Sequence, residues 1–324
     1  IALRLLQNGA RVTLFDNLSR KGSAENLEWL SGCGSPSFID GDVADQVKIG
    51  NAVREVRPNV IFHLAGQVAM TTSVANPLRD FQTNVVGSVN LLEAVRAECP
   101  EALVLYSSSN KVYGALDGVR LEEKEFRYEA PDYPKGIGEN APLDFRTPYG
   151  CSKGAADQYF LEYALTYGLK TVVFRHSTIY GGRQHSTYDQ GWVGWFCQQA
   201  LDQKKTPNAE PFTISGDGKQ VRDLLHVEDA VDCYLAAAEQ MGKVSGQAFN
   251  IGGGMANSSS LLELFQELEK SLKIRLNFTP KEWRHEDQRF FVADNSRIFD
   301  ATGWCPQVSR ESGIARTLKW VEEQ

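Results

Sequence analysis

The chain has 324 residues, of which 23% are charged and 42% hydrophobic, and its formal net charge is −7. That length suits one large or two modest domains, the negative charge argues against nucleic-acid and anionic-membrane partners, and no stretch approaches the ~20 apolar residues of a membrane-spanning helix. The six cysteines are scattered without a Cys-x-x-Cys pair or a histidine cluster, which is typical of reduced core thiols in a cytoplasmic protein and predicts neither disulfides nor a metal site.

The first nine residues predict the end of an amphipathic helix that Gly9 closes. A strand is predicted directly after it, over residues 12–16. A dinucleotide-binding fold needs a strand and a Gly-rich turn before such a helix, and neither precedes Ile1. We therefore expect the chain to lack the front of that fold.

The strand at residues 12–16 ends in a carboxylate, Asp16, which Asn17 follows. In a Rossmann unit, an acid at this place accepts hydrogen bonds from the adenosine ribose and repels a 2′-phosphate. Asp16 therefore favours NAD over NADP, and the nearby Arg20 weakens that preference. The alternative for Asp16 is an ordinary turn residue.

Further strands are predicted over residues 38–40, 60–64 and 102–106, and a long helix over residues 77–98, with Pro77 in its first turn. The small residues after the second of these strands, Ala65 and Gly66, would let the backbone approach a cofactor, whereas His63 is predicted to be a packed core imidazole. Apolar strands that alternate with helices predict an α/β fold with a doubly wound parallel sheet covered on both faces.

The strand at residues 102–106 runs into a serine cluster, Ser107 to Ser109, and forty residues later Tyr149-x-x-x-Lys153 begins a helix-compatible run. Tyr149 and Lys153 share one face of that helix. A phenol with a pKa near ~10 is a poor base at neutral pH, but a neighbouring ammonium and a cationic nicotinamide ring favour the phenolate. Ser109 could share a substrate alcohol with Tyr149, so these residues can deprotonate an alcohol while hydride leaves its carbon.

The second half of the chain adds a strand at residues 171–175, a strand and turn at 212–218, a strand and helix start at 221–230 and a strand and turn at 248–253, and from about residue 181 it becomes polar, Gly-rich and then strongly aromatic. Arg222 and Arg284 are the candidate ligands of a phosphate or ribose, because the planar guanidinium matches the geometry of phosphate. The alternative for each of them is a surface ion pair.

Taken together, the strand-end acid, the serine cluster and the Tyr-Lys pair resemble the extended short-chain dehydrogenase/reductase superfamily. The resemblance implies an NAD-binding Rossmann domain of residues 1–176 plus 221–249 and a smaller nucleotide-sugar-binding domain of residues 177–220 plus 250–324. It implies that the catalytic residues are Tyr149, Lys153 and Ser109. The implied cofactor ligands are Asp16, Asn17, Arg20, Asp42, Val43, Leu64, Ala65, Gln67, Asn84, Ser107, Tyr149, Lys153 and His176. The implied substrate ligands, with no metal, are Ser109, Arg183, Gln184, Arg222 and Arg284.

Within this superfamily, the triplet Ser109-Asn110-Lys111 is informative. The 4,6-dehydratases look like Thr-Asp-Glu there, because elimination of water needs an acid and a base beside the sugar, and UDP-galactose 4-epimerases look like Ser-Ala-Thr. The chain resembles CDP-paratose 2-epimerases, also called CDP-tyvelose epimerases, over nearly its whole length. The most diagnostic segment is residues 188–197, and residues 16–22, 63–73, 109–114, 148–159 and 287–289 support it.

That family implies NAD-dependent epimerisation at C2 of a CDP-3,6-dideoxyhexose through a 2-keto sugar, in O-antigen biosynthesis and without net redox. Tyr149 would take the proton of the hydroxyl and NAD the hydride. It also implies a cytoplasmic homodimer or homotetramer in which the helices at residues 77–98 and 148–168 pair across a two-fold axis. Two alternatives remain open: another NAD-dependent nucleotide-sugar epimerase or reductase, and a non-catalytic dinucleotide-sensing or RNA-associated relative, a class that commonly loses the Tyr-Lys pair.

Overall fold

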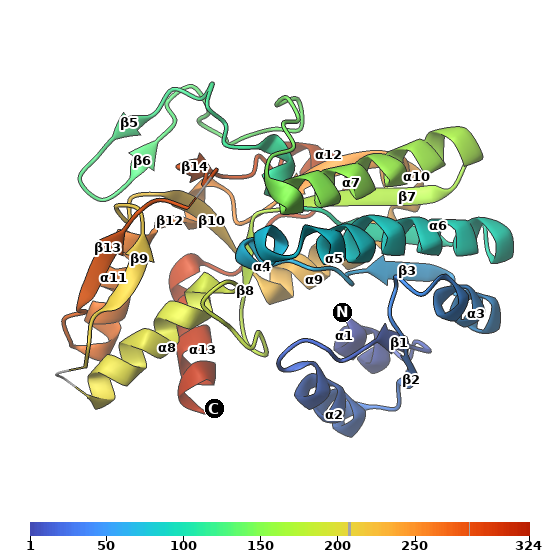
Figure 1. Cartoon of the computed structure of the whole chain (residues 1–324), viewed down its shortest axis with the longest axis horizontal. Coiled ribbons are helices and arrows are strands. Elements are labelled where there is room, and N and C mark those ends of the chain that lie inside the picture. Colours follow the sequence, from blue (N-terminus) through green and yellow to red (C-terminus); the bar gives the residue numbers. More distant parts are fainter. Residues whose placement is uncertain (207–208, 285) are drawn as a thin grey trace. The chain divides into compact units, whose positions relative to one another are not determined.

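A computed structural model describes residues 1–206, 209–284 and 286–324 and divides the chain into two compact units (Figure 1). Unit 1 comprises Ile1–Ser109, Thr147–Arg175 and Val231–Phe249, and unit 2 comprises Asn110–Arg146, His176–Ala230 and Asn250–Gln324. These bounds depart from the predicted domains, because residues 110–146, 176 and 221–230 lie in unit 2. The physical reason is that residues 112–137 share a core with residues 290–293, and the strand at residues 221–226 pairs with strands of unit 2.

Unit 1 is built on a sheet in which β3 (Val60–His63), β4 (Leu103–Ser107) and β7 (Lys170–His176) pair in parallel. β11 (Gln247–Ile251) lies beyond β7 and completes the order β11-β7-β4-β3. The apolar residues of β4 and β7 are buried without a break from 103 to 106 and from 171 to 174. Such continuous burial is typical of a parallel sheet that is covered on both faces.

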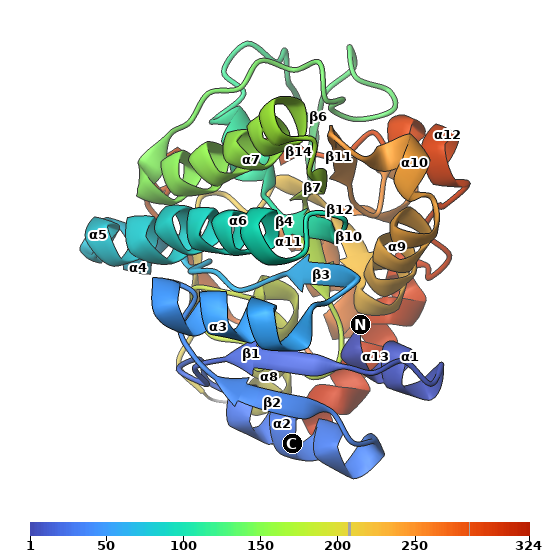
Figure 2. The ribbon, with the colours of Figure 1, turned by 90° about the vertical axis from the view of Figure 1, so that its right-hand side faces the viewer.

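The two faces of this sheet carry different helices (Figure 2). α3 (Gln46–Val56), α6 (Gly87–Glu98) and α7 (Thr147–Tyr167) pack on one face, where Phe160 stacks on Tyr106 with ring centroids 4.4 Å apart. α9 (Val227–Glu239) covers the other face through Tyr234, whose ring lies 4.6 Å from that of Phe174. α10 (Met241–Val244) leads from α9 to β11. This arrangement is the predicted doubly wound sheet.

The first part of unit 1 forms a sheet of its own. α1 (Ala2–Gln7) leads to β1 (Thr13–Asp16), α2 (Ser23–Cys33) and β2 (Ser37–Asp40), and β1 pairs with β2 in parallel. Within the described residues, no strand joins β1 to β3.

The helix predicted over residues 77–98 is continuous but consists of three parts. α4 (Met70–Ala75) precedes it, and Asn76 caps α5 (Pro77–Phe81) by accepting a hydrogen bond from the Arg79 N–H at 3.1 Å. A π-helical turn, η1 (Gln82–Val86), joins α5 to α6. Turns of this kind are rare and occur often at functional sites, and η1 carries the buried Asn84.

Unit 2 has β10 (Val221–His226) at its centre. β10 pairs antiparallel with β12 (Ser258–Ser260) and parallel with β14 (Phe290–Phe291) and β8 (Thr178–Tyr180). Two small sheets, β9 (Phe212–Ser215) with β13 (Phe278–Lys281) and β5 (Glu122–Glu123) with β6 (Tyr128–Glu129), lie outside this one. The short helices of the unit are η2 (Asn110–Tyr113), η3 (Met255–Asn257) and α12 (Ser296–Thr302).

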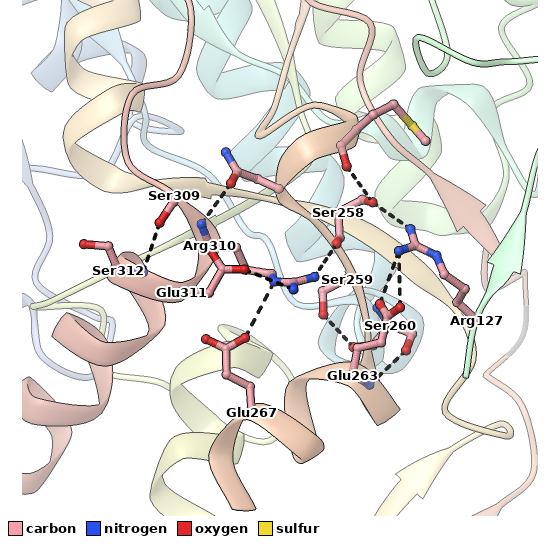
Figure 3. Close-up of polar contacts among 12 residues, drawn as sticks. Arg127, Ser258, Ser259, Ser260, Glu263, Glu267, Ser309, Arg310, Glu311 and Ser312 are labelled. Carbon is pink, nitrogen blue, oxygen red and sulfur yellow. Dashed lines mark hydrogen bonds and ion pairs between the residues drawn. The ribbon is translucent and has the colours of Figure 1, made fainter. Parts of the chain in front are cut away.

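Three longer helices enclose the main core of unit 2: α8 (Trp192–Lys205), α11 (Leu261–Leu272) and α13 (Arg310–Glu322). Their apolar faces meet in one cluster that includes Phe196, Leu264 and Leu318. Polar contacts fix the start of α11, where Arg127 binds Glu263 and Arg310 donates to the Ser258 carbonyl at 2.8 Å (Figure 3). Residues far apart in the sequence therefore hold α11 against β12.

Candidate active site

Tyr149 lies in the first turn of α7, where the Gly150 N–H donates to the Thr147 hydroxyl at 3.2 Å. Its side chain is buried, at 8% exposure, and it is hydrogen-bonded to the side chain of Ser109. Burial raises the pKa of Tyr149 to about 12, although the hydrogen bond with Ser109 opposes that shift. The structure therefore brings the predicted phenol and serine hydroxyl together.

Lys153 lies one turn further along α7 and is almost fully buried. Its Nζ donates to the Ser107 carbonyl and lies 4.6 Å from the centre of the Tyr106 ring. Burial lowers the pKa of Lys153 to about 8, and the carboxylates of Asp80 and Asp157 oppose that shift. The ammonium is thus held by a carbonyl and an aromatic face at the end of β4.

Asn84 connects the loop after β3 to α7. Its Oδ1 accepts from the Gln67 N–H at 2.9 Å, and its Nδ2 donates to the Gln67 carbonyl at 3.0 Å and to the Ser152 hydroxyl at 2.9 Å. Beside it, His63 bonds to Ser88 at 3.0 Å, and burial lowers the pKa of His63 to about 3. His63 is therefore a neutral core imidazole, as predicted.

The predicted ligands of the adenosine lie after neighbouring strands. Asp16 ends β1 and accepts from the Leu18 N–H at 2.6 Å, while Asp42, which follows β2, accepts from the Asn17 amide at 2.9 Å. The buried Val43 is held through its carbonyl, which accepts from Asn90 at 3.1 Å. Arg20 lies in the same loop as Asn17. Because β1 and β2 are parallel and in register up to Asp16 and Asp40, these residues meet at one edge.

The loop after β3 has the form that a dinucleotide requires. A Cβ atom at Gly66 would lie 2.9 Å from the Asn84 Oδ1 and in ordinary contact with the Lys153 Nζ at 3.6 Å, so a larger residue would force the Asn84 amide to move. Leu64 beside it is 49% exposed and offers an apolar surface. A side-chain-free backbone next to an ammonium, with carboxylates at the strand ends where an adenosine ribose would lie, is compatible with NAD.

In unit 2, Arg222 and Lys111 share one carboxylate. The Asp287 Oδ1 accepts from the Arg222 Nη2 at 3.0 Å and lies 3.3 Å from the Lys111 Nζ. All three side chains are 12–16% exposed. Burial lowers the pKa of Lys111 to about 8, whereas Lys111 and Arg222 outweigh burial at Asp287 and lower its pKa. Two cations against one anion leave a net positive cluster, which suits a phosphate.

Arg284 lies within electrostatic reach of Lys111 and Asp287, and its guanidinium stands over the Tyr188 ring at 5.4 Å. Arg183 and Gln184 follow β8, and the Gln184 amide donates to the Ile179 carbonyl at 3.1 Å, so it braces this turn. The buried His176 ends β7. The structure thus brings Arg284 near the Arg222 cluster, whereas Gln184 bonds to its own turn.

The predicted ligands did not include Lys111, Asp287 or Asp80, although all three are charged residues of these sites. Lys111 and Asp287 belong only to motifs of the family resemblance, and Asp80, fully buried in α5, belongs to none of them. Asp80 lies four residues before Asn84, the spacing that places two residues on the same side of a regular helix. This spacing was the one signal in the sequence that could have identified it.

The sequence model of the NAD dependent epimerase/dehydratase family matches residues 1–252 of this chain. The chain belongs to this family. It is 52% identical over 316 residues to the CDP-paratose 2-epimerase of Salmonella typhi, across 98% of this chain and 93% of that protein. Membership confirms the predicted family, the Rossmann fold class and the prediction of an NAD-dependent epimerase.

Solved structures agree with this family. The UDP-glucose 4-epimerase of Thermotoga maritima with UDP-glucose has a TM-score of 0.82 at 30% identity, covering 99% of this chain and 93% of that one. The UDP-glucose 4-epimerase of Thermus thermophilus, solved with NAD, has a TM-score of 0.80 at 27% identity, covering 99% and 94%. Among the described residues of this chain, no helix is long and apolar enough to cross a membrane. Within the same residues, no group of His, Cys, Asp and Glu side chains is arranged to hold a metal ion.

Proposed function

We propose that this protein is a CDP-sugar 2-epimerase that interconverts CDP-paratose and CDP-tyvelose. The observation that carries the proposal is the 52% identity to the Salmonella typhi CDP-paratose 2-epimerase over 98% of the chain. The buried pair of Tyr149 and Ser109, with Lys153 one turn away, supports it, because this pair can remove a proton from a sugar hydroxyl.

The chemistry follows from the position of the reacting carbon. C2 of a 3,6-dideoxyhexose is not next to a carbonyl, so its hydrogen is not acidic enough to leave as a proton. Bound NAD would supply a hydride acceptor and donor, which makes inversion through a 2-keto sugar feasible. Tyr149 removes the proton from the C2 hydroxyl and returns it after inversion, and Ser109 donates a hydrogen bond to the oxygen in both states.

The remaining residues bind and orient. Asp16, Asp42 and Val43 would hold the adenosine of NAD. The loop at Gly66, which carries no side chain at that position, would leave room for the rest of the cofactor beside Lys153. In unit 2, the cluster of Lys111, Asp287 and Arg222, with Arg284 nearby, suits the diphosphate of the nucleotide sugar.

The residues after Ser109 argue against dehydration. The buried Asn110 amide donates to the Gln288 side chain at 2.8 Å, and Lys111 is paired with Asp287. Neither residue supplies the carboxyl group that could protonate a leaving hydroxyl, so the site favours an enzyme that moves only hydride and a hydroxyl proton.

A second candidate is 4-epimerisation of a UDP-sugar, favoured by the 30% identity to the Thermotoga maritima enzyme. The deciding experiment incubates the purified protein with CDP-paratose deuterated at C2, and separately with UDP-glucose. We expect CDP-tyvelose that keeps its deuterium at C2 and no UDP-galactose, as measured by NMR. Conversion of UDP-glucose alone would replace the first proposal with the second.

A further inference from the structure

Asp80 is the buried charge that the proposed reaction does not yet use. It lies in α5 with an exposure of 0%, its carboxylate oxygens are shielded from solvent, and the Ser152 side chain is the hydrogen-bonding group that faces them. An ionised carboxylate is costly to bury without compensation. Burial raises the pKa of Asp80, and the Ser152 hydroxyl and the Lys153 charge oppose that rise. Its compensation therefore comes from α7, against which α5 packs.

The groups that face Lys153 come from four elements. Asp157 lies on α7, Tyr106 on β4, His63 on β3 and Asp80 on α5. His63 is neutral, because burial lowers its pKa to about 3. Tyr106 has its pKa raised well above the ordinary value by burial, so it is also neutral. Among these groups, only two carboxylates can balance the ammonium.

One of these two carboxylates, that of Asp157, already pairs with an arginine. Asp157 accepts two hydrogen bonds from Arg175, both at 2.9 Å, and a third from the Ser108 hydroxyl at 2.7 Å. A bidentate pair of this kind neutralises the carboxylate locally. Asp80 is the other carboxylate, and Lys153 is the cation whose charge acts on it across the packed helices α5 and α7.

We propose that Asp80 is a positioning residue: its buried carboxylate is the counter-ion of Lys153 and keeps the ammonium charged beside Tyr149. The proposal rests on the proposed function for its effect on turnover, but not for the charge interaction between Asp80 and Lys153. A purely local role at the start of α5 is less suitable for Asp80, because Asn76 already caps that helix at 3.1 Å.

The first experiment measures the pH dependence of kcat for CDP-paratose in the wild-type protein and in Asp80→Asn. Removal of the negative charge lets Lys153 lose its proton at a lower pH, so we expect the alkaline limb of the profile to move down by about one unit. The matched control is Asp45→Asn, which changes an exposed cap of α3, bonded to the Val47 and Lys48 N–H groups at 3.0 Å. An unchanged limb in Asp80→Asn overturns the proposal.

The second experiment needs no substrate. Unfolding midpoints in urea at pH 7 are compared for Asp80→Asn, Lys153→Met and the double variant. If the two charges compensate each other, the double variant shifts less than the sum of the single shifts. The control cycle of Asp45→Asn with Lys153→Met should be additive, and additivity at Asp80 overturns the proposal.

The two experiments also separate this proposal from the proposed function. If the wild-type protein does not convert CDP-paratose, the proposed function fails and the unfolding cycle alone decides the role of Asp80. If Asp80→Asn does not yield folded protein, recovery of folding in the Asp80→Asn/Lys153→Met variant supports the charge interaction between the two residues. Continued failure of the double variant overturns it.

Discussion

At the scale of single residues, Tyr149 is the group that meets the reacting alcohol in the proposed mechanism. Tyr149→Phe removes only the phenolic oxygen, so we expect NAD binding to persist and turnover to fall by about 10²–10⁴. Initial rates with CDP-paratose, together with NAD titration, measure both effects. The control is Tyr159→Phe on the same helix, a tyrosine that is 44% exposed. Near-normal turnover in Tyr149→Phe would remove this phenol from the mechanism.

A second prediction at the residue scale concerns Gly66. A methyl group there would meet the Asn84 Oδ1 at 2.9 Å and displace the loop that faces Lys153. We expect Gly66→Ala to weaken NAD binding about tenfold, equivalent to ~1.4 kcal/mol, as measured by calorimetry. Gly32→Ala in α2 is the matched control, because a Cβ there has nothing within 4 Å. Equal NAD affinity in both variants would contradict the placement of the cofactor at this loop.

At the scale of elements, the start of α11 depends on a reciprocal pair of hydrogen bonds. The Ser260 hydroxyl accepts from the Glu263 N–H at 3.1 Å, and the Glu263 carboxylate accepts from the Ser260 N–H at 2.9 Å. We expect Ser260→Ala to lower the free energy of unfolding by about 1 kcal/mol, as measured by denaturant titration. Ser271→Ala, at an exposed place near the end of the same helix, should not destabilise the protein.

The elements also show what the sequence could and could not predict. The strand that ends at Asp16 and the helix that begins before Tyr149 were predictable, because their signals lie within a few residues. The place of residues 110–146 in unit 2 was not, because it depends on contacts with residues 290–293. The shared carboxylate of Lys111 and Arg222 was missed for the same reason, since Asp287 is far from both in the sequence.

At the scale of the whole molecule, α5 and α7, with the neighbouring α4, carry several exposed large hydrophobic side chains. The exposed side chains are Val74, Leu78, Phe81, Tyr159, Leu165 and Tyr167, with Leu165 at 82%. A surface of this kind marks an interaction site, and it lies on the helices that we predict to pair across a two-fold axis. We propose that the enzyme is a homodimer, or a homotetramer built from that dimer.

The test of this assembly is Leu165→Glu, which puts a charge on the proposed interface without disturbing the core. We expect light scattering to show a dimer or tetramer for the wild-type protein and a smaller species for the variant. Phe299→Glu changes a side chain of α12 that is 50% exposed and should leave the mass unchanged. A wild-type monomer at micromolar concentration would contradict the assembly.

The π-helical turn η1 constrains the chain in a way that no single side chain does. Each residue of an α-helix advances the direction of the side chains by about 100°, so the extra residue held in η1 sets the phase between α5 and α6. Deleting one residue from this turn would let the helix close regularly, and the face of α6 with Leu92 and Val95 would turn away from the core. Between Asp80 and Leu92, the number of residues therefore matters as much as their identity. In this segment, evolution or protein design can substitute a residue more readily than delete one.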